Sequence, residues 1–416
     1  MRNKSKIFLF LAVFTWVSLP AQSRISFSES ELTEICQDYY IVSSCPDATQ
    51  KAIYILAASS ATGASDQSEL TDLYLYKIGK TGTLLQKIRL VPEQNNSIDY
   101  RLSKGPMLAF PQGPLLALND PGKTRLETLR YPLIKQKDKD PNLLVLATLE
   151  KPYVLDAFRH KSKVLRINDT SCFLLAYNKE TNQEFFLEFE RYGSLLKEIF
   201  LENNLDIWDY EKIREDQIIY IGGKVKTIDS RRQQWEYQTG VFDVDKGCQV
   251  FSDLFHSEFY EVDTSVSPKS FFPKIIKWAD DSFWCIYTSP AKEDSVVFRA
   301  RCYDGQFSYV GEKELFEIQC GSPNKLPPLN LLDAALLGKN HLVILVYTKG
   351  RLAFWVLDKN GRLEMSKSPW KSPKLFSLYG FVPIENSVVA FGREWDSLKD
   401  SLIKRKIYCL NLQEQE

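Results

Sequence analysis

Histidine is the side chain best suited to acid–base chemistry near neutral pH, and this 416-residue chain has three: His160, His256 and His341. None stands in a metal-binding or nucleophile motif, because the chain has no Cys-x-x-Cys pair, no Cys/His cluster and no Gly-x-Ser-x-Gly. His341 opens an apolar stretch and is expected at the edge of the core, whereas His256 lies in an aromatic-rich segment. The sequence therefore predicts no catalytic residue, no metal site and no cofactor.

Two Gly-Lys-Thr triplets, at Gly79 and Gly122, resemble the end of a phosphate-binding loop. That loop requires another glycine five positions earlier, and the residues there are Tyr74 and Ala117. Neither triplet is therefore expected to bind phosphate.

Two acidic pairs, Asp280-Asp281 and Glu293-Asp294, could in principle serve a glycosidase. Such an enzyme needs two carboxylates roughly 5 to 9.5 Å apart across the sugar. Neighbouring carboxylates in a turn are usually only solvated, and we expect that here.

The elements that would position such groups are short apolar runs, which recur along the chain and are typical of buried strands. Their centres are separated by about 56 residues on average, a spacing that indicates a repeat architecture. There are seven runs, at residues 53–56, 115–118, 172–175, 218–221, 283–286, 342–346 and 388–391.

A hairpin pattern follows most of these runs. Residues 75–90 align without a gap to residues 186–201, and each segment reads as a strand, a polar turn ending on glycine, and a return strand. Related versions occur near residues 241–247, 298–305 and 354–363. The turn glycines Gly193, Gly247, Gly305 and Gly361 lie 54, 58 and 56 residues apart, so a second element has the same period.

An inner strand, the apolar strand and the outer hairpin together make a four-stranded antiparallel sheet, the unit that β-propellers arrange around an axis. We therefore predict an all-β fold, a seven-bladed β-propeller of four-stranded antiparallel blades, forming one domain over residues 24–416. The second blade, over residues 105–166, is the least regular. The best helical candidate is a short stretch near residues 329–337.

One unit carries a family resemblance. Residues 218–255 contain Gly222-Gly223, then Trp235 and Tyr237, and this segment resembles a kelch blade with its double glycine. The strand–turn–glycine hairpins also resemble those of secreted bacterial propeller proteins that have no assigned function. The resemblance implies a propeller, and kelch-like function does not follow from it.

The ends of the chain predict how the ring closes. The last segment, residues 407–412, matches the third strand of a unit, and no return strand follows it. A strand near residues 24–28 could fill that vacancy and remove the exposed sheet edge. We expect the N-terminal strand to close the ring.

Recognition residues form the one group with a case for function. In a propeller, the loops between second and third strands and between blades share one face. Exposed Trp, Tyr and Arg dominate recognition surfaces, although any single ring of this kind could instead pack beneath a loop. The predicted binding residues are Trp208, Tyr210, Arg231, Trp235, His256, Tyr260, Trp370, Arg393 and Trp395.

Residues 1–23 have the layout of a secretory signal peptide, with basic residues, an apolar run and small residues near Ala21 and Ser23. The run is shorter than the roughly 20 residues that span a bilayer, so we expect cleavage, no membrane insertion afterwards, and a secreted or periplasmic location. All eight cysteines follow this segment and so belong to the exported part of the chain. Disulfides can form in a secreted or periplasmic compartment. We predict one pair, Cys36 with Cys45, and expect Cys172 and Cys285 to be buried thiols.

Composition narrows the partners. Lys plus Arg and Asp plus Glu both total 53, and this balance argues against nucleic acid and anionic membranes as ligands. The sequence favours a monomeric, non-catalytic binding or scaffold protein that recognises a peptide, glycan or partner protein on its loop face. The alternative is a secreted hydrolase or lyase that acts on a carbohydrate or lactone with carboxylates at the axis of the ring.

Overall fold

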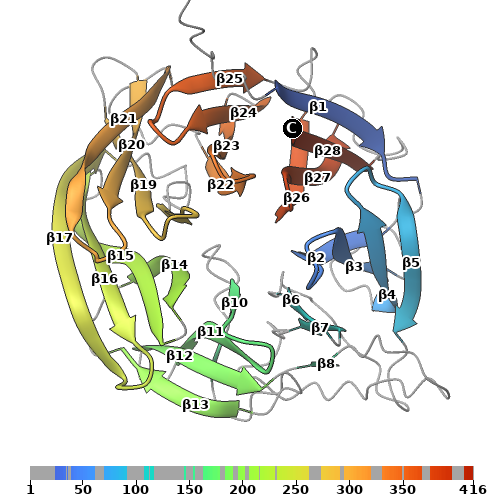
Figure 1. Ribbon diagram of the computed structural model, residues 1–416, viewed down its shortest axis with the longest axis horizontal. Coiled ribbons are helices and arrows are strands. Elements are labelled where there is room, and N and C mark those ends of the chain that lie inside the picture. Colours follow the sequence, from blue (N-terminus) through green and yellow to red (C-terminus); the bar gives the residue numbers. More distant parts are fainter. Residues whose placement is uncertain are drawn as a thin grey trace, which may run out of the picture.

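The computed structural model of the chain describes 28 β-strands arranged in a ring (Figure 1). The described residues are 24–33, 35, 39–60, 70–90, 107–111, 113–116, 145–146, 153–154, 163–178, 183–190, 195–201, 206–214, 216–229, 232–261, 273–290, 295–319, 330–348, 351–367, 375–395 and 407–415. Within these ranges no helix is long and apolar enough to cross a membrane.

Three four-stranded antiparallel sheets come from the first half of the ring. The first is β2 (Tyr39–Pro46), β3 (Ala52–Ser60), β4 (Leu70–Gly79) and β5 (Leu84–Leu90). The second is β10 (Val164–Arg166), β11 (Ser171–Asn178), β12 (Gln183–Glu190) and β13 (Leu195–Phe200), and β9 (Tyr153–Val154) also pairs with β11. The third is β14 (Asp206–Arg214), β15 (Gln217–Asp229), β16 (Arg232–Asp243) and β17 (Cys248–Glu261).

Three more four-stranded antiparallel sheets come from the second half of the ring. They are β18 (Lys274–Lys277), β19 (Phe283–Pro290), β20 (Ser295–Tyr303) and β21 (Tyr309–Gln319), and then β22 (Asn330–Leu337), β23 (His341–Thr348), β24 (Arg351–Asp358) and β25 (Leu363–Lys367). The closing sheet has the order β26 (Leu375–Ile384), β27 (Ser387–Trp395), β28 (Ile407–Gln415) and β1 (Arg24–Glu31). The chain is therefore an all-β propeller with four-stranded antiparallel blades.

The predicted count of seven such blades is wrong for the described residues, which form six. The remaining sheet, between the β2–β5 and β10–β13 sheets, has three short strands: β6 (Met107–Phe110), β7 (Gly113–Leu116) and β8 (Val145–Leu146). Its β7 and β8 run parallel, whereas a propeller blade is antiparallel throughout. This sheet falls in the stretch whose pattern was least regular, because only one apolar run and no hairpin glycine mark it.

The apolar runs form the second strand of each sheet, as their composition predicts. In β3, β15 and β23 the runs are almost completely buried, with Ile53, Ile218 and Leu342 at 0% exposure. A second strand has one strand on each side within its sheet and a neighbouring sheet against each face. Side chains of both orientations are therefore buried, and the strand is apolar throughout instead of alternating.

The N-terminal strand closes the ring, as the chain ends predicted. β1 pairs antiparallel with β28 over its whole length, from Arg24 opposite Gln415 to Glu31 opposite Tyr408. Ser26 adds a side-chain hydrogen bond from its hydroxyl to the carbonyl of Gln413 (3.3 Å). Figure 1 shows β1 at the outer edge of this sheet, beside β28. The final blade is thus built from both ends of the chain.

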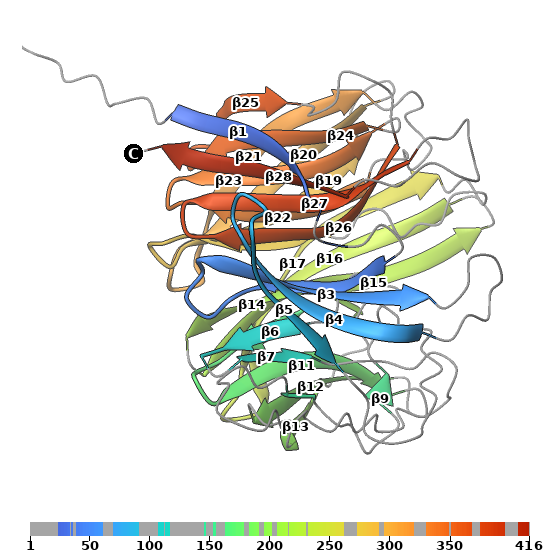
Figure 2. The ribbon, with the colours of Figure 1, turned by 90° about the vertical axis from the view of Figure 1, so that its right-hand side faces the viewer.

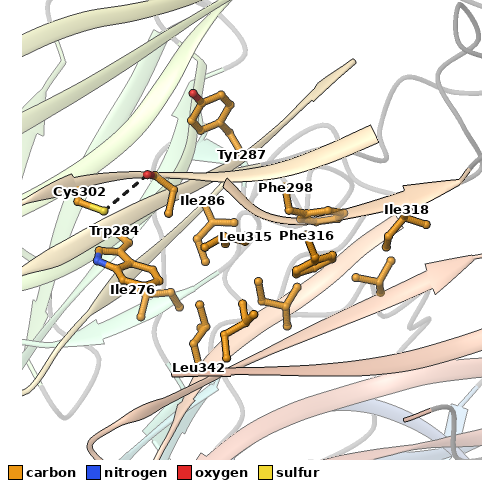
Figure 3. Packing of buried hydrophobic residues seen from close by; sticks show 14 of the residues in the cluster. Ile276, Trp284, Ile286, Tyr287, Phe298, Cys302, Leu315, Phe316, Ile318 and Leu342 are labelled. Atoms are coloured by element: carbon orange, nitrogen blue, oxygen red, sulfur yellow. Dashed lines mark hydrogen bonds between the residues drawn. The ribbon is translucent and has the colours of Figure 1, made fainter. Parts of the chain in front are cut away.

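Apolar clusters fill the space between neighbouring sheets. One described cluster joins the sheets β18–β21 and β22–β25 through side chains such as Trp284, Phe316 and Leu342 (Figure 3), and it includes Trp208 and Tyr237 of the sheet β14–β17. The Phe316 ring stacks on Phe298 and on Trp355, with ring centroids 4.6 and 4.3 Å apart. Similar clusters lie between four pairs of neighbouring four-stranded sheets, so these blades bury their faces against one another instead of in one central core.

Four described outer hairpins turn through one residue in the left-handed conformation, where glycine is favoured because it has no Cβ; the predicted turn glycine Gly193 lies outside the described residues. Gly82, Gly247 and Gly361 have φ of 84°, 64° and 84°, as the hairpin pattern predicts. The prediction is wrong for Gly305, because Phe307 has φ of 66° in that hairpin. Asp304, three residues before Phe307, caps this turn. Its Oδ1 accepts hydrogen bonds from the amides of Gln306 and Ser308 (2.8 and 2.9 Å).

Two further expectations are corrected. The stretch near residues 329–337 is strand β22, not a helix, because its side chains alternate with period two and Ala335 and Leu337 face the core. The thiol of Cys45 is free and buried in β2, so the predicted pair with Cys36, which lies outside the described residues, is not supported. Burial, followed by the nearby Asp47 carboxylate, raises the pKa of Cys45 and keeps it protonated. Cys172 and Cys285 are buried free thiols, as expected.

Candidate functional site

Charged side chains from the innermost strands of four neighbouring sheets approach one another. Lys163 precedes β10, Asp209 and Glu211 lie on β14, Lys274 begins β18, and Asp333 lies on β22. We call these five residues the axial charge network, because these strands surround the axis of the ring in Figure 1.

Salt bridges within the network cross from one blade to the next. Lys163 Nζ lies 2.5 Å from Glu211 Oε2 and 3.5 Å from Asp209 Oδ1. Lys274 Nζ lies 3.3 Å from Asp333 Oδ1. Asp209 also reaches a third blade, because its Oδ2 accepts a hydrogen bond from the amide of Ile275 (2.9 Å). The carboxylates therefore have cationic or amide partners on adjacent sheets.

Tyr210 lies between Asp209 and Glu211 in the sequence and, like Glu211, interacts with Lys163. Its hydroxyl donates to the carbonyl of Lys163 and accepts from the amide of Leu175 (3.2 Å). Its ring packs edge-on against Phe186, with centroids 5.3 Å apart. Burial raises the pKa of Tyr210, so the phenol remains a neutral donor. This residue fastens the sheet β14–β17 to the sheet β10–β13.

The lysines of the network are held in their charged form. Burial alone would lower the pKa of Lys163, but the carboxylates of Asp209 and Glu211 outweigh burial and raise it. For Lys274 burial again lowers the pKa, but the carboxylates of Asp333 and Asp209 outweigh burial, and the pKa is raised. A lysine acts as a base or a Schiff-base nucleophile only when it is neutral. The network therefore supplies fixed charges and cross-links, not an amine nucleophile.

Two of the nine predicted binding residues are corrected, because they belong to the core. Trp208 is 2% exposed and lies against Tyr237, with ring centroids 5.4 Å apart at 72°. Tyr210 is 1% exposed in the position described above. They flank Asp209 on β14, an innermost strand with a blade on each side, so neither offers an exposed ring to a ligand.

Three other predicted residues share one hairpin. Trp235 lies on β16, and His256 and Tyr260 lie on β17, where the backbone registers pair Trp235 with Glu258, Tyr237 with His256 and Gln233 with Tyr260. These residues are predicted in loops, but they lie in an extended β-ribbon, because β15, β16 and β17 have 13, 12 and 14 residues. Their side chains lie outside the described part.

Arg393 and Trp395 lie at the end of β27, with backbone registers opposite Ser377 and Leu375. β27 starts at its hairpin with β26, so Arg393 and Trp395 lie at the opposite end of the sheet. β15 likewise starts at its hairpin with the preceding strand, β14, and runs away from it. In Figure 2 the hairpin of β2 and β3 and the C-terminus lie on the left-hand side, which we call the hairpin end. Arg231 and Trp370 lie outside the described residues. A shared recognition face at the other end stays a prediction.

The double glycine of the kelch-like segment has a clear role in packing. A Cβ on Gly223 would lie 1.8 Å from the carbonyl oxygen of Glu236 and 2.6 Å from Trp208, and one on Gly222 would lie 2.4 Å from the carbonyl oxygen of Asp206. These distances are far below contact, so both positions require glycine. The pair lets Trp208 pack directly against the backbone of the blade.

The acidic pair of the sequence analysis is structural where it is described. Asp280 accepts a hydrogen bond from the Ser282 hydroxyl (2.6 Å) and pairs with Lys359 of the next sheet. The Lys359 ammonium, helped by Ser282, lowers the pKa of Asp280 to about 2. Asp281 has φ of 61° and pairs with Lys277 at 3.0 Å. Within the described ranges no three His, Cys, Asp or Glu side chains form a metal-binding group. Glu293 and Asp294 lie outside these ranges.

Sequence reasoning missed the axial charge network, because its members come from segments 46 to 63 residues apart. One signal was present: Asp209 stands between the large rings of Trp208 and Tyr210. An acid is rarely fully buried without a partner, so such a position predicts one.

Comparisons with known proteins find no family, and their matches to solved structures are distant. No family model matches the chain, and no curated protein matches it. Among solved structures, a protein of unknown function from Dyadobacter fermentans is 9% identical with a TM-score of 0.40, over 91% of this chain and 100% of that one. The β-propeller domain of the trilobed protease from Pyrococcus furiosus is 10% identical with a TM-score of 0.33, over 92% and 97%.

A structure from a study of two prolyl endopeptidases is 8% identical with a TM-score of 0.32, and the match covers 85% of this chain. This chain spans only 38% of that endopeptidase. At such identities no activity is transferred, and the β-propeller assignment rests on the strand pairing and the ring described above.

Proposed function

We propose that this protein is an exported, non-catalytic binding or scaffold protein that takes a peptide, glycan or partner protein at the end of the ring opposite the hairpin end. The observation that supports this proposal is the pairing of the axial acids. Asp209, Glu211 and Asp333 are all engaged by lysines of neighbouring blades, and Asp209 is also held by a backbone amide. Carboxylates engaged in this way brace the ring.

The proposal includes a seventh, incomplete blade. The innermost strands contact one another in the order β2, β6, β10, β14, β18, β22 and β26, and β26 contacts β2. The sheet β6–β8 therefore occupies the place of a blade in this circuit, although it lacks the four antiparallel strands.

The binding test uses the mature chain from residue 24 on arrays of glycans and peptides. The variant combines Trp235→Ala with Trp395→Ala and leaves the buried Trp208 intact. Truncated aromatic hot spots cost about 2 kcal/mol each, so we expect an affinity loss of at least about 30-fold for a true ligand. Lys80→Ala with Lys339→Ala, on the hairpin end, is the matched control, and melting temperatures verify folding. Unchanged affinity in the tryptophan variant contradicts the proposed face.

A second candidate is a hydrolase or lyase acting on a carbohydrate or lactone. The observation that favours it is that Asp209 and Glu211 stand two residues apart on one innermost strand and share Lys163. Turnover of chromogenic glycosides and of lactones, lost in both Glu211→Gln and Asp209→Asn, would support this candidate. Absence of turnover across the substrate panel, together with a ligand retained by the Glu211→Gln protein, would support the binding role.

A further inference from the structure

Strand β17 is the longest outer strand of the six blades. It has 14 residues, whereas β5, β13, β21, β25 and β1 have 7, 6, 11, 5 and 8. Each of these strands stands at the end of its sheet, and Figure 1 shows β17 on the outer circumference of the ring. Within the described part of the chain β17 pairs with β16 alone. Its outer edge can therefore pair with a strand of another chain.

Charged side chains protect the other outer strands better than β17. Natural sheets place charges on their edges because a charge opposes pairing with a further strand. Residues 248–255 of β17 include one charged residue, Asp253, and it pairs with Arg301 of the next sheet at 2.7 Å. The other five outer strands have at least two each: Lys87 and Arg89; Lys197 and Glu198; Glu312, Lys313, Glu314 and Glu317; Glu364 and Lys367; Arg24, Glu29 and Glu31.

Side chains in this part of β17 alternate between the core and solvent. Phe251 and Phe255 pack against the sheet β18–β21, with ring centroids 6.3 Å from Tyr303 and 5.4 Å from Tyr287. The opposite face is exposed: Val250 is 47% and Leu254 66% exposed, and the residue between them in this row is Ser252. The edge therefore presents an uncharged row of two apolar side chains around a small polar one.

This row matches a second copy of itself. When two copies of one strand pair antiparallel about a two-fold axis, the residue at the axis lies opposite itself. With Ser252 at the axis, Val250 of each copy lies opposite Leu254 of the other and on the same face of the sheet. Asp253 lies opposite Phe251, so no two like charges meet. Both exposed apolar side chains are covered in this arrangement.

Three other outer strands do not allow such a pairing at their centres. The middle residue is Lys87 in β5 and Glu314 in β21, and β13 has Lys197 and Glu198 at its middle. A symmetric pair about any of these residues brings two like charges together, which destabilises a sheet. Of the remaining two, β25 has only five residues, and β1 begins and ends with a charged residue.

We propose that this protein pairs with a second copy of itself through residues 248–256 of β17, with Ser252 at the two-fold axis. The two β14–β17 sheets then form one continuous antiparallel sheet. Because the two β17 strands run in opposite directions, the hairpin end of one ring lies beside the opposite end of the other. The interface is on the circumference, so the two proposed binding faces lie outside it and point in opposite directions. This pair replaces the monomer that the composition favours.

Disulfide trapping tests the register, and the exposed free thiol of Cys248 provides the matched control. In the mature chain, Cys248→Ser combined with Ser252→Cys moves this thiol to the axis. Opposite Cα atoms there lie about 4.5–5.5 Å apart, a separation that a disulfide spans. Two copies of Cys248 stand eight residues apart along the paired strands, or about 26 Å, which is too far.

We expect mild oxidation to convert most of the Ser252→Cys protein to a covalent dimer and to leave the wild type unlinked. A variant that stays unlinked overturns the proposal. A wild type that is linked as completely as the variant also overturns it, because the thiols would then meet without the proposed register.

Opposite charges at the axis give a second test that needs no oxidation. Ser252→Lys and Ser252→Glu each place like charges opposite each other, so each variant should self-associate at least about tenfold more weakly than the wild type in sedimentation velocity. An equal mixture of the two brings lysine opposite glutamate and should recover the dimer. Ser308→Lys, on the exposed turn of the neighbouring outer hairpin, is the control and should leave self-association unchanged.

Recovery in the mixture separates a lost contact from a misfolded sheet, because misfolded variants do not rescue each other. A mixture that stays monomeric overturns the proposal. A wild type that sediments as a monomer at every soluble concentration also overturns it, and leaves the edge of β17 to a strand of a different protein.

Discussion

Two junctions of this ring are fastened by different chemistry. The junction of the sheets β10–β13 and β14–β17 is held near the axis by salt bridges of Lys163 with Asp209 and Glu211. The closing junction is held at the hairpin end by a histidine between glutamates, and on the outside by a strand from the other end of the chain. The comparison teaches that neighbouring blades are cross-linked by charged side chains, whereas the closing blade also depends on eight paired backbone positions between β1 and β28.

The largest expected effect comes from removing the closing strand. Deletion of residues 24–31 removes the eight paired positions of β1 and exposes β28 as a free edge. We expect the melting temperature to fall by at least about 10 °C, since each kcal/mol lost shifts it by about 2–4 °C in proteins of 150–250 residues. Differential scanning calorimetry measures it. Glu29→Ala, on an exposed position of the same strand, should change little, and an unchanged melting temperature in the deletion would refute closure by β1.

The next effect concerns the salt bridges of Lys163. Lys163→Met leaves Asp209, 6% exposed, and Glu211 without their cation. Breaking a fully buried pair costs about 3–5 kcal/mol, and because Lys163 is 35% exposed we expect about 2 kcal/mol. Urea unfolding measures this loss of free energy of unfolding. An unchanged free energy of unfolding would contradict the cross-link between the two sheets.

A smaller effect is expected at the turn of β24 and β25, which packs on the preceding blade. In Gly361→Ala the alanine must adopt φ of 84°, and its Cβ lies 3.2 Å from Leu315. The left-handed conformation costs a residue other than glycine about 1–2 kcal/mol, so we expect a destabilisation of about that size in urea unfolding. Gly305→Ala is the matched control, because Phe307 supplies the left-handed residue in that turn.

The smallest effect is expected for the exposed salt bridge of Lys359 with Asp280, which joins the sheets β22–β25 and β18–β21. The pKa of Asp280 is lowered in the folded protein, so the pair stabilises above the ordinary carboxyl pKa near 4 and its contribution disappears as the pH falls toward 2. With both side chains about half exposed, Lys359→Met should cost less than about 1 kcal/mol. Melting temperatures of the two proteins should differ slightly at pH 6 and converge below about pH 2. A difference that persists at about pH 1.5 contradicts the assignment.

Much of the fold could be predicted from local sequence. The second strands are apolar throughout because both faces are buried, and Gly82, Gly247 and Gly361 mark turns that need a left-handed residue. Phe307 shows the limit of this logic. Its ring lies 6.0 Å from that of Phe283, so packing holds a bulky residue where local preference favours glycine.

The candidate site was harder to predict, because it depends on contacts between blades. Trp208 and Tyr210 have the composition of recognition residues, yet their place on an innermost strand buries them. Lys163 and Asp209 look unrelated in the chain, and only the ring brings them to 3.5 Å. Cys45 has a possible partner nine residues away in sequence, but its orientation into the core leaves the thiol free.

The pairing of β1 with β28 also determines the order in which the molecule can be finished. The Ser26 hydroxyl bonds to the carbonyl of Gln413, a contact that spans 387 residues of sequence. A contact at such separation forms slowly, because nearly the whole chain must be confined before the two strands meet. The strand that is synthesised first therefore pairs last, and until it does so the unpaired edge of β28 is open to the corresponding strand of another copy. Dilution during refolding should accordingly favour the ring closed within one chain over a pair of chains that have exchanged their first strands.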